Sequence, residues 1–64
     1  MSLYDYLRGI EIYKEDEPFY ALIMAAMLKA DSDNAFKLRQ VFPETWSELS
    51  NRYQRPGGRL EGES

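Results

Sequence analysis

An uninterrupted run of ten apolar residues, from Phe19 to Leu28, constrains this chain more than any other feature. The run is too short to cross a membrane, which takes about 20 apolar residues, so we expect a helix that belongs to a protein core. Because no polar residue interrupts the run, this helix has no side suited to solvent and must be covered on most of its faces. In a chain of 64 residues, this predicts a central helix that is wrapped either by the rest of the chain or by a second copy.

The size and composition of the chain limit its stability and its chemistry. A chain of 64 residues forms one domain at most, and a core of that size supplies about 3–5 kcal/mol of net stability. The sequence contains no cysteine and no histidine, which excludes disulfides, thiolate or imidazole metal sites and catalysis by either group. No side chain with a near-neutral ordinary pKa is present, so we expect no enzyme, no catalytic residue, no cofactor and no metal.

Helical spacing of apolar residues predicts an all-α compact bundle of three to four short helices, at about residues 3–12, 18–30, 33–42 and 43–54. Ser2 is a candidate N-cap of the first helix, whose apolar face carries Leu3, Tyr6, Leu7 and Ile10. The stretch from Ile10 to Tyr13 alternates between apolar and polar residues, so these residues could be extended instead of helical.

Prolines and acidic residues mark the breaks between the helices. Pro18 suits the first position of the second helix, and Asp16 or Glu17 is placed to face the amides of its first turn. Pro43 opens the fourth helix, whose inward face is predicted to carry Trp46, Leu49 and Tyr53. Residues 1–54 are then the domain, and the Pro/Gly-rich residues 55–64 are expected to form a flexible tail.

Two acidic segments invite other interpretations. Asp31, Asp33 and Asn34 match the start of a calcium loop, but the later ligand positions hold Ala35, Phe36 and Phe42, so the segment is better explained as a turn rich in helix caps. The acidic loop at residues 15–17 could imitate a phosphate backbone, but four acids including Glu11 are few for that role, and a solvated loop is the preferred interpretation.

A set of mostly basic residues forms the candidate contact site for a partner or a nucleic acid: Lys37, Arg39, Arg52, Tyr53, Arg55 and Arg59. If the third helix and the end of the fourth are adjacent, the cations form a local patch and Tyr53 can stack on a base. A helix-turn-helix made of the second and third helices is a related option. The formal charge of −3 argues against nucleic acid as the main partner, and ordinary surface charge is the simplest explanation.

Phe36 lies about 100° away from the apolar face of the third helix, which makes it a candidate exposed anchor for a partner. Tyr4 and Tyr13 are peripheral in the same way, although such residues commonly fold over the ends of a small core.

The segment from residue 25 to residue 58, about half of the chain, resembles small uncharacterised helical proteins of bacteria and of their phages or mobile elements. The likeness is carried by Lys29 to Asn34, Lys37-Leu38, Phe42-Pro43-Glu44, Trp46, Glu48-Leu49, Arg52-Tyr53 and Pro56-Gly57-Gly58. The resemblance implies a cytosolic protein with an accessory role, and it assigns no activity and no binding residue.

These features predict a small helical module that acts through another macromolecule, with no enzymatic activity. The expected partner is another protein, and a second copy of the chain, giving a homodimer, is one option. The alternative is a small nucleic-acid-binding regulator that uses the basic patch. Because the first residues lack the basic region and long apolar stretch of a signal peptide, a cytoplasmic location without membrane association is expected.

Overall fold

A computed structural model describes residues 2–63 of the chain as four α-helices followed by a short 3-10 helix. The elements are α1 (Leu3–Lys14), α2 (Phe19–Lys29), α3 (Ser32–Val41), α4 (Pro43–Tyr53) and η1 (Pro56–Gly58). The predicted all-α class with four short helices is confirmed, and every helix boundary agrees with the sequence expectation to within two residues. Met1 and Ser64, the outer residues of the predicted domain and tail, lie outside the described part.

Helix α1 begins where its capping residue predicts. The Ser2 hydroxyl accepts a hydrogen bond from the Asp5 amide over 3.1 Å, which satisfies one of the free amides of the first turn. The helix continues through Ile10 and Tyr13 to Lys14, so the alternative of an extended end is wrong.

The linker between α1 and α2, Glu15–Pro18, has one unusual backbone conformation, at Asp16. Asp16 has φ 57°, in the left-handed region that Asp tolerates better than most residues. Pro18 is extended, with φ −59° and ψ 143°, and precedes the helix, so its predicted place as the first helical residue is wrong by one position. Among residues 2–63, no side-chain hydrogen bond caps α2, and none joins Asp16 or Glu17 to the amides of its first turn.

The two remaining junctions follow their local sequence signals. Asp31 is the N-cap of α3, and its carboxylate accepts a hydrogen bond from the Asn34 amide over 2.9 Å. Phe42 separates α3 from α4 with φ −125° and ψ 62°, a conformation outside the helical region, as expected for a residue before proline. Pro43 is then the first residue of α4, as predicted.

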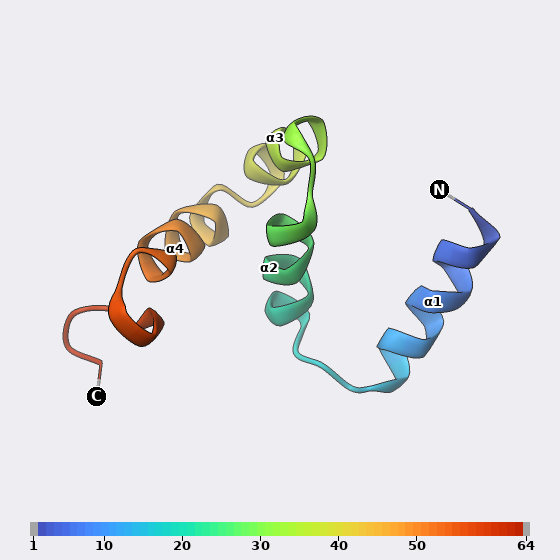
Figure 1. Ribbon diagram of the computed structural model, residues 1–64, viewed down its shortest axis with the longest axis horizontal. Coiled ribbons are helices and arrows are strands. Elements are labelled where there is room, and N and C mark those ends of the chain that lie inside the picture. Colours follow the sequence, from blue (N-terminus) through green and yellow to red (C-terminus); the bar gives the residue numbers. More distant parts are fainter. Residues whose placement is uncertain (1, 64) are drawn as a thin grey trace.

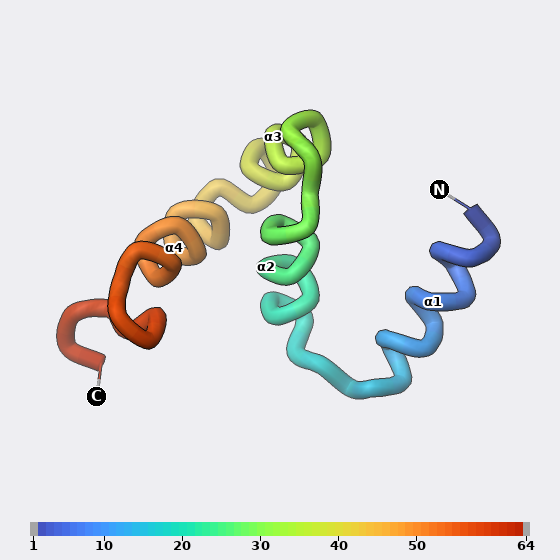
Figure 2. Tube along the Cα trace, viewed as in Figure 1, coloured from blue at the N-terminus to red at the C-terminus, as the bar shows by residue number. Residues whose placement is uncertain are grey.

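Helices α2, α3 and α4 pack against one another and form what we call the packed unit, while α1 contacts none of the other elements of residues 2–63. In Figure 1 and in the trace of Figure 2, α1 lies on the side of α2 that faces away from α4, joined only by the linker. The radius of gyration is 13.6 Å, compared with about 11 Å for a compact chain of this length. The detached α1 accounts for this larger size.

The interior of the packed unit is small. Met27, 4% exposed, is the one buried apolar residue among those described, and Trp46 and Leu49 are only partly covered. The chain itself does not wrap α2, since Phe19, Tyr20 and Leu28 are each more than half exposed. The prediction of a helix covered on nearly every side is therefore wrong for the single chain, because α1 does not close over it.

Candidate interaction surface

Four of the apolar residues of α1 form a continuous stripe along one side of the helix, and α1 contacts no other element of residues 2–63, whereas half-buried Ile12 lies on the other side. We call this stripe the α1 face, and it consists of Leu3, Tyr6, Leu7 and Ile10. Their exposed fractions are 72%, 65%, 51% and 38%, respectively. An ion pair of 2.6 Å joins Arg8 and Glu11, both outside this stripe. The helix therefore has the amphipathic pattern of a packed helix without the packing.

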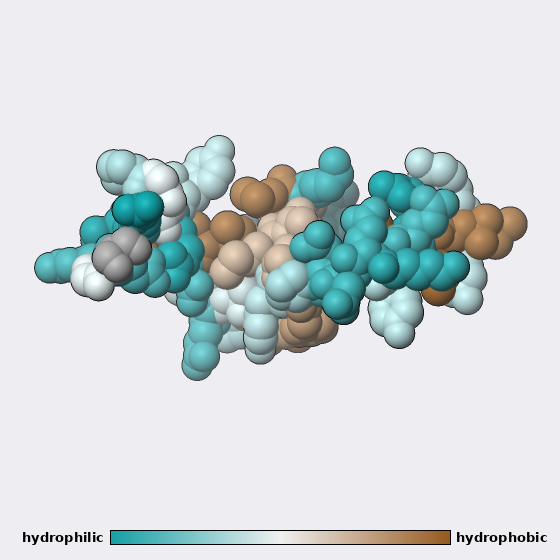
Figure 3. All heavy atoms as spheres, turned by 90° about the horizontal axis from the view of Figure 1, so that it is seen from below, coloured by the Kyte–Doolittle hydropathy of each residue, from teal (hydrophilic) through white to brown (hydrophobic). Residues whose placement is uncertain are grey.

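A second apolar area lies on the side of α2 opposite the buried Met27, and at Leu28 it borders the groove against α4. Helix periodicity places on this side a set of residues that we call the α2 face: Ala21, Leu22, Ala25 and Leu28. Leu22 is half-buried and the others are exposed, with Leu28 at 60%. Seen from below, apolar side chains reach the surface at the middle of the molecule, where α2 lies, and at the α1 end, with hydrophilic residues between them (Figure 3).

The exposed area of the chain is large for its mass. The structure exposes 5745 Å² of solvent-accessible surface for 7.5 kDa, compared with about 4,200 Å² for a typical folded monomer of that mass. The excess is about 1,500 Å², and large apolar side chains contribute to it along α1 and α2. An excess of this size and composition is typical of a subunit separated from its partner.

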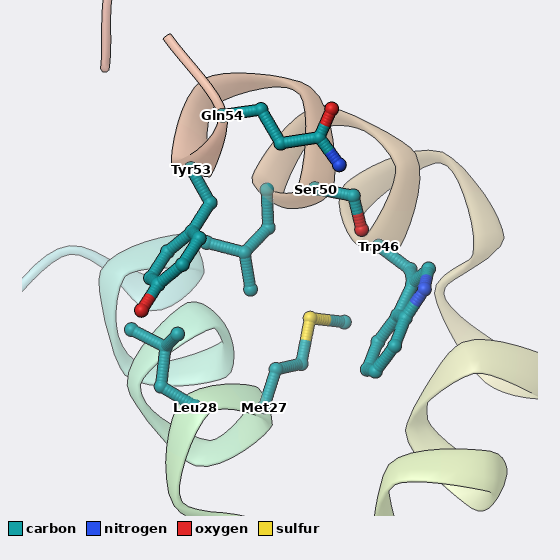
Figure 4. Close-up of a pocket in the computed structure, with 7 residues that line it drawn as sticks. Met27, Leu28, Trp46, Ser50, Tyr53 and Gln54 are labelled. Carbon is teal, nitrogen blue, oxygen red and sulfur yellow. The ribbon is translucent and has the colours of Figure 1, made fainter. Parts of the chain in front are cut away.

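A shallow apolar groove lies between α2 and α4 and encloses about 240 Å³. Met27 and Trp46 line one part of it, and Leu28 and Tyr53 line another, with Ser50 and Gln54 along the α4 side (Figure 4). Tyr53 is 78% exposed, so its predicted inward position is wrong. The tyrosine is the last residue of α4, where no third helix closes over the ring.

The other side of Trp46 faces α3. A second shallow hollow there is lined by Trp46, Phe36, Arg39 and Ala35, among others. Phe36, the candidate anchor, is 62% exposed. Trp46 thus lines hollows against both α2 and α3, and Phe36 lines the second one at the surface.

The candidate basic residues are divided between two ends of the packed unit. Lys37 lines a hollow with Lys29 between α2 and α3, whereas Arg52, Arg55 and Arg59 lie at or beyond the far end of α4. In Figure 1 this end of α4 points away from α3. The predicted single basic patch required α3 to lie beside the C-terminal end of α4. That adjacency is absent, because α3 lies near the N-terminal end of α4.

Arg52 is held by acidic residues of its own chain. Its guanidinium donates to Glu48 over 3.0 Å and to both carboxylate oxygens of Glu63 over 2.7 and 2.8 Å. The side-chain hydrogen bond with Glu63, and then the one with Glu48, raises the pKa of Arg52 above its ordinary value. The hydrogen bond from Arg52, together with one from the Leu60 amide, lowers the pKa of Glu63 to about 2. The charge of Arg52 is thus largely compensated within the chain.

The same contacts connect the C-terminal tail to α4. Arg52 also donates to the Gly58 carbonyl over 2.9 Å, and the Leu60 amide donates to Glu63 over 2.9 Å. Gly57 and Gly58 have φ values of 64° and 69°, which allow the chain to reverse direction here. The segment expected to fray therefore folds back over the end of α4.

Among residues 2–63, no helix is both long enough and apolar enough to span a bilayer, and no group of three carboxylates is arranged to hold a metal ion. No protein family, no curated protein and no solved structure matches this chain. The candidate site is therefore defined by its own geometry.

Sequence reasoning did not single out the α1 face as a site, nor Glu63 as the partner of Arg52. The stripe of Leu3, Tyr6, Leu7 and Ile10 was visible, but the same pattern predicts a helix packed in a bundle. The signal that could have separated the two cases is the linker, in which a proline follows three charged residues and restrains the residue before it.

Proposed function

We propose that this chain is a non-enzymatic protein-interaction module that binds its partner through the α1 face and the α2 face. The observation that carries the proposal is the excess of about 1,500 Å² of exposed surface, which includes an amphipathic helix that contacts no other element of residues 2–63. Covering one such side chain stabilises a complex by about 1.5–3 kcal/mol. A partner that covers these faces therefore stabilises the complex by burying apolar side chains that the single chain leaves exposed.

The resemblance of residues 25–58 to small helical proteins of bacteria and their mobile elements supports the setting of this module. We infer an accessory role in the bacterial cytosol or during phage growth, in which the module occludes a surface of its partner or serves as a scaffold. This part of the proposal depends on the resemblance and assigns no pathway.

Affinity capture with matched baits tests the proposal. Leu7→Glu places a charge in the α1 face, whereas Tyr4→Glu places the same charge on an exposed position of the same helix outside this face. Proteins captured by the wild-type chain should be lost with Leu7→Glu and retained with Tyr4→Glu. Equilibrium sedimentation completes the test, because a strictly monomeric wild-type chain that captures nothing would contradict the proposal.

The alternative, a nucleic-acid-binding regulator, has less support. Arg52 is engaged by Glu48 and Glu63, and the remaining cations do not share one surface. A nucleic-acid interface of useful affinity needs several cations aligned along a backbone. The protein-interaction function is therefore the one that the geometry favours.

A further inference from the structure

We propose that the partner of the α1 face is the α2 face of a second copy of this chain, so that two copies exchange their α1 helices. The inference rests on the proposed function and specifies its partner. Each copy donates one α1 and accepts one α1, which covers both faces of both copies and closes the assembly about a two-fold axis.

The area of exposed surface supports a second copy. An excess of about 1,500 Å² per chain corresponds to about 3,000 Å² for a pair, within the range of obligate homodimers. Contact between two α1 helices alone is too small to cover this excess, because each helix is about 18 Å long and 10 Å wide. The α2 face has to be covered as well, and the exchange of α1 helices covers both.

The linker favours contact with another copy over closure within one chain. Left-handed Asp16 sets the direction of the chain between α1 and α2, and Pro18, whose ring fixes φ, restrains Glu17. Closure onto the same α2 requires these residues to adopt new conformations. Contact with the α2 of another copy leaves the linker as it is, which is the usual origin of an exchanged segment.

The charges at the helix ends indicate the direction of packing. Lys14 extends the α1 face at its C-terminal end, Glu17 precedes α2, and Lys29 ends it. Antiparallel packing of α1 on the partner's α2 brings Lys14 towards the acidic end, whereas parallel packing brings it towards Lys29. Opposite charges favour the antiparallel arrangement, in which Leu7 and Ala25 lie at matching heights near the middle of the two helices.

Disulfide trapping between two different variants tests the exchange, because the natural chain has no cysteine. Chains with Leu7→Cys are mixed with chains with Ala25→Cys and oxidised, so that a mixed disulfide forms only between copies. We expect a covalent pair of these two variants, and no pair when Tyr4→Cys replaces Leu7→Cys. Preferential pairing of Leu7→Cys with itself would show that α1 helices bind one another and would overturn the exchange.

Sedimentation equilibrium and hydrogen exchange on the cysteine-free wild-type chain distinguish the remaining outcomes. We expect twice the monomer mass, protected α1 amides, and a dimer dissociation constant at least about 100-fold higher for Leu7→Glu, since two leucines are affected per dimer. A monomer with unprotected α1 amides would overturn the exchange and leave the proposed function standing, with the α1 face free for a different protein. A monomer with protected α1 amides would show closure onto its own α2 and would overturn both.

Discussion

Arg52 and Glu63 are joined by two nearly parallel hydrogen bonds of 2.7 and 2.8 Å across eleven positions of the sequence. This bidentate contact connects the last described residue of the tail to the last turn of α4. It orders a segment rich in glycine, and it occupies the guanidinium of Arg52, which two parallel hydrogen bonds to a carboxylate leave with less capacity to bind a phosphate.

The tail should detach from α4 when Glu63 is protonated. The pKa of Glu63 is lowered from its ordinary 4.5 to about 2, so its contribution to tail docking is fully present above pH 4.5 and is lost as the pH falls through about 2. An NMR titration of the Leu60 amide, which donates to Glu63, should show this loss. Glu63→Gln should release the tail at neutral pH, and Glu61→Gln should not. Tail signals that change neither with pH nor in the Glu63→Gln variant would contradict the role of Glu63 in docking the tail.

Trp46 should be essential to the packed unit. Its side chain lines the groove with Met27 of α2 and the hollow with Ala35 and Phe36 of α3, so Trp46→Ala removes apolar surface that lies between α4 and both helices. Because the ring is only partly buried, we expect a loss of about 3 kcal/mol, the low end for a tryptophan truncation. That loss matches the whole net stability expected of a core this small, so the variant should be largely unfolded.

Circular dichroism melts of Trp46→Ala and Trp46→Phe measure this effect. The phenylalanine variant keeps most of the apolar contact and should remain folded with a lower midpoint. An unchanged midpoint in the alanine variant would show that Trp46 contributes to an interface instead of to the fold.

The helices were predictable from the sequence because their limits depend on local chemistry. Ser2, Asp31 and Pro43 act within one turn of the helix that they begin, and each does so in the structure. The apolar spacing around Trp46 and Leu49 identified the inward face of α4 for the same reason.

The arrangement of α1 and the state of Arg52 were not predictable in this way. The first depends on the backbone of Asp16, whose left-handed conformation changes the direction of the chain without leaving any periodic signal. The second depends on Glu63, which reaches Arg52 only after the chain has reversed at Gly57 and Gly58. Periodicity describes which side of a helix is apolar, but it does not state which molecule covers that side.

Helix α1 should unfold independently of the packed unit when the chain is monomeric, because it contacts no other element of residues 2–63 and a 12-residue helix is marginal alone. Ser2→Ala removes its N-cap and should cost about 1 kcal/mol, all of it in α1. Asp31→Ala removes the corresponding cap of α3 and should lower the stability of the packed unit by a similar amount. Hydrogen exchange at low protein concentration measures the stability of α1 and of the packed unit separately for each variant. Equal effects of Ser2→Ala on α1 and on α4 would contradict independent unfolding.

Nucleic acid should bind weakly at most. The chain carries a net charge of −3, and Arg52 is paired with Glu48 and Glu63. The other cations are distributed over α1, α2, α3 and the tail, so they do not line up along one phosphate backbone. We expect no gel shift of duplex DNA or of single-stranded RNA at about 50 mM salt, where phosphate contacts are strong. A salt-sensitive shift that is lost in an Arg55→Gln/Arg59→Gln variant would favour the nucleic-acid function instead. The Leu7→Glu variant separates the two functions further, because it disrupts the α1 face and leaves every basic residue in place.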